Sequence, residues 1–416
     1  METDQRERLL AATVAVVAEK GYEATRVADL LEASGVSRNA FYKLYANKHD
    51  CFLAAIDAIV ELSGPTVLDV YDKTDGPWDV RLAAMLDALA ATIVAQPAVA
   101  RIGWIEVYAA GPEAVKRIEQ IDSRVEKIVV SALNESPERA GMPLDVVRAV
   151  NGGLRKLIHT RLREGRESEL PAMMSEAFEW MLSYRTPAER MWRPRKPPAG
   201  LVVEAEAPAT ARERILAAVT EIVAEKGYPA MAITEIASRA AVSLTTFYGC
   251  FGGKEDAFVA AIDRVRVRTM LVAASAFQRD EGWPRAVAAG IHALVGLFAL
   301  DPGMARLGGV AAYEGGSAAL ESRDAGLTDA ETFLAEGFRL HPDTPSIAAE
   351  AVAATIYALL SDQIRHRRAD RLYEIAPTAV YLTLAPFIGS EAAAAVANER
   401  LGVSPDRARA VAVGAG

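Results

Sequence analysis

The chain of 416 residues is 51% hydrophobic and has a formal net charge of −9 at pH 7. Each half is long enough to bury its own core, and the many alanines favour packed helices. The acidic balance argues against a surface that attracts nucleic acid everywhere, because such affinity comes from neutralised phosphates; a few local cations can still meet a phosphate backbone. We expect no apolar stretch to reach the roughly 18 residues that a bilayer requires and, with no signal-peptide layout, a cytoplasmic chain.

The sequence contains an internal duplication. Residues 6–56 recur at 212–262 without a gap, and about 23 of the 51 positions are identical. We call the two halves copy one and copy two. Weaker matches continue downstream, such as Trp78 with Trp283. The prolines within 187–209 interrupt any helical period, so this segment is predicted to be a semi-stiff connector between two complete domains.

The first fifty residues have the pattern of a helix-turn-helix. Residues 6–20 place apolar side chains on one stripe of a helix, and Gly21 suits a left-handed C-cap. A short helix through 27–31, a tight break at 34–36 and a second short helix from Ser37 follow. Copy two repeats this pattern 206 residues later. Two short helices around a glycine turn predict a unit whose second helix can enter the DNA major groove.

A longer string of residues surrounds both patterns. In copy one it comprises Gly21, Tyr22, Thr25, Gly35, Val36, Ser37, Phe41, Tyr42, Tyr45, Lys48 and Phe52. In copy two it comprises Gly227, Tyr228, Val242, Ser243, Phe247, Tyr248, Phe251, Lys254 and Phe258. At these residues the chain resembles the tetracycline-repressor (TetR) family of bacterial transcription regulators. The resemblance implies an all-α fold with two tandem copies of a helix-turn-helix DNA-binding domain plus a helical ligand-binding and dimerisation domain, packed as an intramolecular pseudo-dimer.

The resemblance also implies a function and a domain plan. The function is that of an effector-responsive DNA-binding regulator of the repressor type, whose partners are double-stranded operator DNA and a small, largely apolar effector. The two copies would pair within one chain, and further homodimerisation stays open. The predicted parts are two helix-turn-helix domains (1–50 and 210–256), two effector-binding and dimerisation domains (51–186 and 257–390), a proline-rich linker (187–209) and an alanine-rich C-terminal extension (391–416).

Two kinds of DNA contact are expected. The resemblance implies that Tyr42 and Lys48 touch the phosphate backbone, whereas Arg38 and Asn39 can bond guanine and adenine bidentately. The predicted DNA-binding residues are Thr25, Ser37, Arg38, Asn39, Tyr42, Lys43 and Lys48 in copy one, and Ser243, Leu244, Thr245, Thr246, Tyr248 and Lys254 in copy two. The aromatic residues Phe41, Phe52, Phe247 and Phe258 are assigned to the core instead.

Copy two departs from the family pattern. Leu244 and Thr245 replace Arg38 and Asn39, so its second helix has neither a cation nor an amide fork there. Gly249 replaces Lys43, and Met231 replaces Thr25. Ala241 stands where copy one has the turn glycine Gly35; an alanine forced into a left-handed turn costs about 1–2 kcal/mol, so this turn either differs in shape or accepts the strain. We expect an asymmetric operator, with a scaffold role for the second helix-turn-helix as the alternative.

The remaining segments, from about 52 to 186 and from 258 to 390, are predicted to be helical. Candidate residues of the effector pockets are Met85, Trp104, Tyr108 and His159 in copy one and His292, Met304, Tyr313 and Tyr357 in copy two, although core packing uses the same residue types. By resemblance, the last two helices of each copy pair as a four-helix bundle. They fall near 144–164 with 170–184 and near 347–367 with 371–386, and Gly152 and Gly153 would permit close approach.

No catalytic chemistry is predicted. The five histidines have no paired ligand spacing, and no nucleophile motif or phosphate-binding glycine loop occurs. Cys51 and Cys250 lie at non-equivalent places in the two copies and are expected to be small buried hydrophobes. We therefore expect no enzyme, no cofactor and no metal. A small-molecule-binding or adaptor protein whose helix-turn-helix units no longer bind DNA is the alternative function.

Overall fold

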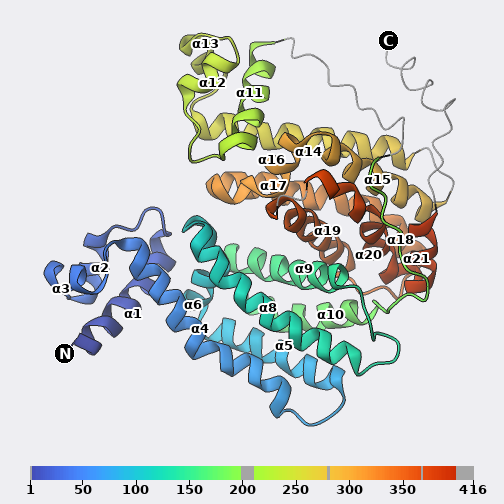
Figure 1. The fold of residues 1–416 in the computed structure, drawn as a ribbon, viewed down its shortest axis with the longest axis horizontal. Helices are drawn as coiled ribbons and strands as arrows, with labels where there is room; N and C mark the ends of the chain where they lie inside the picture. Colours follow the sequence, from blue (N-terminus) through green and yellow to red (C-terminus); the bar gives the residue numbers. More distant parts are fainter. Residues whose placement is uncertain (1, 198–209, 279–281, 367–368, 400–416) are drawn as a thin grey trace. The chain divides into compact units, whose positions relative to one another are not determined.

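Helices form all the regular structure of the described chain. The computed structural model describes residues 2–197, 210–278, 282–366 and 369–399, and every regular element in these ranges is a helix (Figure 1). The all-α prediction is confirmed.

The chain divides into two compact units. The first comprises Met1–Val147 with Leu154–Met181, and the second Arg148–Gly153 with Leu182–Gly416. Each unit contains one of the two repeated N-terminal segments, so the duplication corresponds to two separately packed structures. The predicted domain boundaries remain predictions.

The first helix-turn-helix lies at the predicted place. α1 (Glu2–Lys20) precedes α2 (Val27–Ser34) and α3 (Arg38–Leu44). Gly35 ends α2 in the left-handed conformation, with φ 64° and ψ 17°, and its N–H donates to the Leu31 carbonyl. A glycine adopts this conformation without the steric cost of a Cβ, so the short sequence between the helices determines the turn.

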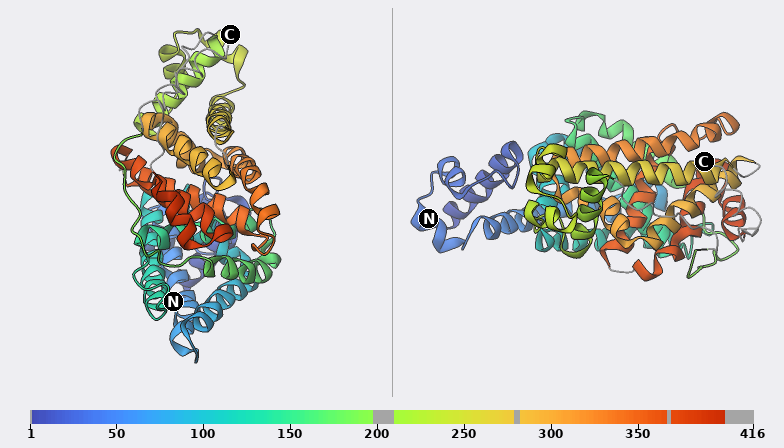
Figure 2. Two further views of the ribbon diagram at one scale, coloured as in Figure 1. Left: turned by 90° about the vertical axis from the view of Figure 1, so that its right-hand side faces the viewer. Right: turned by 90° about the horizontal axis from the view of Figure 1, so that it is seen from above.

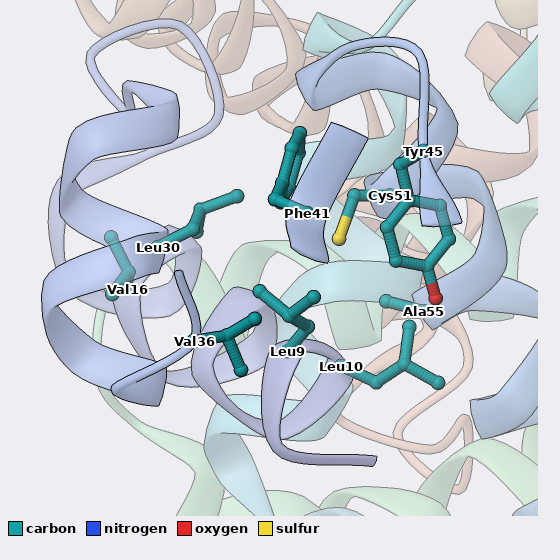
Figure 3. Close-up of a cluster of buried hydrophobic side chains, with 9 residues drawn as sticks. All are labelled: Leu9, Leu10, Val16, Leu30, Val36, Phe41, Tyr45, Cys51 and Ala55. Carbon is teal, nitrogen blue, oxygen red and sulfur yellow. The ribbon is translucent and has the colours of Figure 1, made fainter. Parts of the chain in front are cut away.

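A small core holds these three helices together (Figure 3). Its buried residues are Leu9, Leu10, Val16, Leu30, Val36, Phe41, Tyr45, Cys51 and Ala55. Phe41 is fully buried, as predicted. Cys51 Sγ lies 3.2 Å from the Thr13 hydroxyl, and burial raises the pKa of this thiol to about 11. Cys51 is therefore a core residue, whereas Cys250 is only partly buried, contrary to expectation, because it ends an exposed helix.

The long helix α4 (Lys48–Lys73) joins the helix-turn-helix to the rest of the first unit. Its first turns belong to the core of Figure 3, and its later turns pack against α5 and α8. Within the first unit, the right-hand view of Figure 2 shows the N-terminal helices at one end. The remaining elements of copy one are α5 (Trp78–Ala95), α6 (Pro97–Arg101), the π-helix η1 (Ile102–Glu106), α7 (Val107–Ala109), α8 (Pro112–Asn134), α9 (Leu144–Arg163), η2 (Glu167–Glu169) and α10 (Leu170–Leu182).

The second unit repeats the same plan. Its helix-turn-helix comprises α11 (Ala211–Lys226), α12 (Ile233–Arg239) and α13 (Leu244–Cys250). The later elements are α14 (Lys254–Phe277), α15 (Trp283–Leu300), α16 (Pro302–Gly309), η3 (Ala311–Glu314), α17 (Gly316–Glu331), η4 (Thr332–Leu334), α18 (Ala335–Leu340), α19 (Ala348–Arg365), η5 (Ala369–Ile375), α20 (Ala376–Ile388) and α21 (Ser390–Asn398).

One turn of copy two decides between the two predicted alternatives, and another differs from expectation. Ala241 has φ 51°, and no other described non-glycine residue has a positive φ. The second turn therefore keeps its shape and accepts the strain of a left-handed alanine. Gly227 has φ 81° but ψ 168°, so it ends α11 outside the left-handed helical region that was predicted.

The connector packs on copy two. The Tyr184 hydroxyl donates to the Leu382 carbonyl at 2.8 Å, and the Trp192 indole donates to the Ala397 carbonyl at 3.0 Å. The Trp192 N–H also donates to Asn398 Oδ1. The chain up to Trp192 therefore lies along α20 and α21. Of the predicted linker, 198–209 lies outside the described residues, as does 400–416 of the C-terminal extension.

Glycines permit a close approach within the second unit. A Cβ added at Gly152 would lie 2.6 Å from Ala358 Cβ, and one at Gly153 would lie 3.1 Å from Thr355 Cα. The first distance is shorter than real Cβ atoms show, and the second is so tight that Thr355 would have to shift. The 148–153 segment of α9 thus reaches α19 only because both positions are glycine.

Two helices are longer and more apolar than the sequence analysis expected. An 18-residue window has a mean hydropathy of 1.6 in α4 and of 1.4 in α15. By length and composition, both helices could cross a membrane. The two helical segments Trp78–Ala95 and Pro97–Ala109, bent by 106° relative to each other, together are also long and apolar enough to cross a membrane. The expectation that no stretch reaches this length is wrong. Most of the α15 window, 61%, is buried, and α15 packs against α14 and α20. Only 33% of the α4 window is buried, although the first turns of α4 belong to the helix-turn-helix core.

Candidate nucleic-acid interface

A serine caps the second helix of each helix-turn-helix. Ser37 Oγ accepts a hydrogen bond from the Ala40 N–H at 3.2 Å, and Ser243 Oγ accepts one from the Thr246 N–H at 3.0 Å. The Thr246 hydroxyl lies 2.8 Å from Ser243 Oγ. These hydroxyls, assigned to base contacts from the sequence, satisfy free N–H groups at the start of α3 and α13 and so fix where each helix begins.

The outer face of α3 combines cations with polar and aromatic groups. All four candidate contact residues on this helix are exposed: Arg38, Asn39, Tyr42 and Lys43. The solvent-exposed fraction of Tyr42 is 47%. The Arg38 guanidinium carbon lies 5.8 Å from the centre of the Tyr42 ring. Phe41 anchors the opposite side of the helix in the core. The helix thus presents groups that can bond purine edges and phosphates together.

The outer face of α13 is exposed but uncharged. The solvent-exposed fraction is 46% for Leu244 and 56% for Tyr248, and Thr245 is also exposed. The nearby cation Arg239 donates to both carboxylate oxygens of Glu225, at 2.6 and 2.8 Å. Its charge is therefore largely compensated within the protein. The asymmetry in residue types between the copies is also an asymmetry between exposed surfaces.

Thr25 and Lys48 face the protein more than the sequence suggested. Thr25 is 2% exposed, and its hydroxyl donates to the Gly21 carbonyl at 2.7 Å. The Lys48 ammonium donates to the Tyr22 carbonyl at 2.7 Å and lies 4.3 Å from the centre of the Tyr22 ring, and burial lowers its pKa. As a correction, Thr25 holds the turn after α1 rather than a phosphate. Lys48 stabilises the same turn through its hydrogen bond to the Tyr22 carbonyl, and its side chain is only partly exposed.

In both copies a carboxylate joins the helix-turn-helix to the helical domain. The Tyr22 N–H donates to Glu106 Oε2 at 2.8 Å, and the Tyr228 N–H donates to Glu314 Oε2 at the same distance. Glu106 is buried at the end of the π-helix η1, where burial raises the pKa of its carboxyl. The next carbonyl along the chain accepts from Lys48 in copy one and, at 3.4 Å, from Lys254 in copy two. We call these two carboxylates the junction glutamates.

Sequence reasoning missed the junction glutamates. The tyrosines that donate to them are 206 residues apart, but the glutamates are 208 apart, so they are not aligned in the duplication. Glu106 ends a π-helix and Glu314 ends a 3₁₀-helix. Each lies within two residues of a predicted pocket tyrosine, Tyr108 or Tyr313. A glutamate close to the same tyrosine in both copies is the sequence feature that could have identified them.

Three of the four pocket candidates of copy one lie together around an arginine. Arg155 Nε donates to the Tyr108 hydroxyl at 3.1 Å, and its guanidinium lies 4.5 Å from the centre of the Trp104 ring. The His159 ring is edge-on to Tyr108, with ring centres 6.2 Å apart. Met85 belongs to a different cluster around α5 and α8. The sequence analysis did not select Arg155.

Two of the four candidates of copy two also share an arginine. The Arg323 guanidinium carbon lies 4.8 Å from the centre of the Tyr313 ring and 5.4 Å from that of Tyr357. His292 is instead paired with Tyr373, its Nδ1 2.8 Å from the hydroxyl, and burial lowers the pKa of His292 to about 4. Met304 is a buried residue of α16. Tyr313 is equivalent to Tyr108, so both copies place a guanidinium on the same tyrosine.

These structures define a protein with two helix-turn-helix domains of the kind found in transcription regulators. Residues 9–55 and 215–261 each match the model of the family described as bacterial regulatory proteins, tetR family. Two separate segments of the chain therefore match the TetR family model, and the tandem duplication is confirmed.

Among the proteins similar to the chain are one curated relative and three solved structures. The uncharacterized HTH-type transcriptional regulator YezE of Bacillus subtilis is 32% identical over 73 residues, which are 18% of this chain and 36% of that protein. The chain thus matches only about a third of that relative's length.

The solved structures are similar to about half of the chain. They are FadR from Bacillus subtilis in complex with stearoyl-CoA (18% identical, 42% of this chain and 97% of that one, TM-score 0.38), FadR from Bacillus halodurans (16%, 44% and 97%, TM-score 0.39) and a TetR family regulator from Marinobacter aquaeolei VT8 (19%, 42% and 95%, TM-score 0.35).

Proposed function

We propose that the chain is an effector-responsive DNA-binding transcriptional repressor that acts in the cytoplasm. The observation that carries this proposal is the exposed, cation-bearing face of α3 on a closed helix-turn-helix core of the TetR family. The residues that meet DNA are Arg38, Asn39, Tyr42 and Lys43 of copy one and Leu244, Thr245, Thr246 and Tyr248 of copy two. Ser37, Ser243, Lys48 and Lys254 position these helices and reach the backbone at their ends.

The two copies act as an intramolecular pseudo-dimer. Two features of the second unit support this arrangement: the approach of Gly152 and Gly153 to α19, and the packing of the connector along α20 and α21. A short connector raises the effective concentration of one copy near the other to roughly the millimolar scale. One chain then supplies both recognition helices, about 34–36 Å apart, for one face of the DNA.

The operator of such a chain is asymmetric. A homodimer presents two identical helices, whereas α3 and α13 offer different side chains to their half-sites. Arg38 and Asn39 are exposed and can each form bidentate bonds to a purine, which are worth about 1–3 kcal/mol of discrimination. Leu244 and Thr245 offer apolar and hydroxyl contacts instead. Copy one thus carries most of the sequence discrimination.

The junction glutamates transmit the effector signal. Each lies within two residues of the pocket tyrosine, Tyr108 or Tyr313, and each accepts from the backbone N–H that follows the first helix of its helix-turn-helix. An effector that moves the tyrosine also moves this acceptor. The helix-turn-helix then tilts, the separation of α3 and α13 changes, and DNA is released without unfolding.

DNA binding tests the proposal most simply. We expect the full chain to bind a duplex from its own promoter region with an affinity that falls steeply between about 50 and 200 mM salt. Lys43→Ala should reduce the slope of log affinity against log salt by about one unit. The matched control is Lys116→Ala, which removes an exposed cation of α8 outside the helix-turn-helix and should leave the slope unchanged.

A second function is favoured by the surface of copy two. The uncharged face of α13 and the ion pairs of Arg239 suit a helix-turn-helix kept as a scaffold in a small-molecule-binding or adaptor protein. Absent or salt-insensitive DNA binding would support this function and contradict the repressor.

A further inference from the structure

The second unit contains a buried cation beside the predicted pocket of copy two. Arg323 lies on α17, and only 3% of its side chain is exposed. Its guanidinium lies between the rings of Tyr313 and Tyr357, both of which were predicted to line the effector pocket. A buried guanidinium is costly unless its N–H groups and its charge are satisfied.

The guanidinium is satisfied on one edge only. Arg323 Nε donates to Asp324 Oδ1 at 2.8 Å, and Nη2 lies 2.8 Å from the same oxygen without the angles of a hydrogen bond. By hydrogen-bond distance and angle, neither Nη1 nor the buried Tyr357 hydroxyl has a partner within the described chain, although the two side chains interact electrostatically. Asp324 therefore balances the charge but leaves the donors of the Nη1 and Nη2 edge without an acceptor.

In copy one, the corresponding guanidinium has hydrogen-bond acceptors within the protein. Arg155 lies against the equivalent tyrosine, donates to Tyr108 and to the Gly103 carbonyl at 3.0 Å, and lies 3.4 Å from Asp122. Its side chain is also more exposed, at 18%. The protein itself thus supplies acceptors to the guanidinium of copy one, and the guanidinium of copy two lacks them.

We propose that the Nη1 and Nη2 edge of Arg323, with the Tyr357 hydroxyl, binds the oxyanion of a small organic ligand in copy two. A carboxylate or a phosphate matches this planar fork with two parallel hydrogen bonds, and a neutral group does not. The inference rests on the proposed effector response and narrows the effector class: the ligand is an anion with an apolar body, and only copy two takes it. The effector expected from the sequence was largely apolar, and the proposal adds an anionic group at one end of it.

Thermal unfolding of the full chain, without DNA, tests the site. The probes are benzoate, phenyl phosphate and their uncharged counterpart benzamide. We expect at least one of the two anions to raise the Tm more than benzamide does, because a ligand that binds only the folded state stabilises it. Arg323→Met should weaken that binding at least about tenfold. Arg323→Lys keeps the charge without the fork and should weaken it less.

A matched variant in copy one separates a binding role from a structural one. Arg155→Met removes internal hydrogen bonds, so it should lower the Tm of the free protein yet keep the anion-induced rise. Arg323→Met also removes the ion pair with Asp324, so both variants are compared by the anion-induced rise in Tm rather than by the Tm of the free protein. The inference is overturned if neither anion exceeds benzamide, or if Arg323→Met keeps the full rise. Anion binding that leaves DNA affinity unchanged would instead contradict the proposed effector control.

Discussion

Removal of a single carboxylate should loosen the connection between the two domains of copy one. Glu106→Ala deletes the acceptor of the Tyr22 N–H, which lies 2.8 Å away. A hydrogen bond to a charged acceptor contributes about 1.5–3 kcal/mol, and a buried donor left unpaired costs about 1–3 kcal/mol. Because burial raises the pKa of Glu106, its ionised form already has a desolvation cost. We therefore expect a net local loss of about 1–2 kcal/mol.

Hydrogen exchange at the Tyr22 amide measures this loss directly. A change of 1–2 kcal/mol corresponds to roughly 5–30-fold faster exchange, if the amide exchanges by local opening. Glu106→Gln is the control, since its amide oxygen can still accept, and it should keep most of the protection. Unchanged protection in Glu106→Ala, or equal loss in both variants, would refute the acceptor role.

The same carboxyl should give a defined pH dependence. Burial raises the pKa of Glu106 above its ordinary value of 4.5, so the folded protein holds this proton more tightly than the unfolded chain. Its contribution to stability is fully present below pH 4.5 and is lost as the pH rises through the folded-state pKa. Relative to wild type, Glu106→Gln should therefore gain stability as the pH rises through this window, measured as urea midpoints.

Three further predictions concern the recognition helices, the turns and the second pocket. Arg38→Ala should flatten base preference in one half-site at a cost of about 1–3 kcal/mol, and Leu244→Ala should cost less; selection of sites from random DNA gives the readout, and symmetric losses would contradict the asymmetric operator. Gly35→Ala should destabilise copy one by about 1–2 kcal/mol, because φ is 64° there, whereas Ala241→Gly should be neutral or stabilising by up to about 1 kcal/mol, since relief of strain exceeds the glycine entropy cost. Equal urea midpoints for wild type and Gly35→Ala would argue against strain. Burial lowers the pKa of His292 to about 4, so its contribution is present above pH 6.5 and is lost as the pH falls through 4. His292→Gln should blunt that acid-induced loss of stability, and an unchanged acid profile would contradict it.

The sequence was sufficient for the helix-turn-helix units because their signals are local. Apolar spacing, a turn residue and a capping serine all act within about forty residues. The apolar spacing and the serine recur at a fixed offset, whereas Ala241 replaces the turn glycine in copy two. The family match at 9–55 and 215–261 and the conformation of Gly35 agree with that prediction. The strain at Ala241 was one of two outcomes that the sequence left open.

The partners of the helical domains were not predictable in the same way. Glu106 and Arg323 act through residues far away in the chain, at helix registers that apolar periodicity does not determine. Copy one takes its guanidinium from α9 and copy two from α17, so even the duplication did not align them. Trp192 was assigned to a linker, but it hydrogen-bonds to the helix α21 that copy one lacks.

The stoichiometry of the DNA complex tests most directly whether one chain fills both half-sites. Analytical ultracentrifugation of the full chain with a labelled duplex, chosen by selection from random DNA, should give a complex of one chain per duplex, with binding that shows no dependence on chain association at low concentration. A complex that requires two chains per duplex, each engaging through only one helix-turn-helix, would contradict the pseudo-dimer.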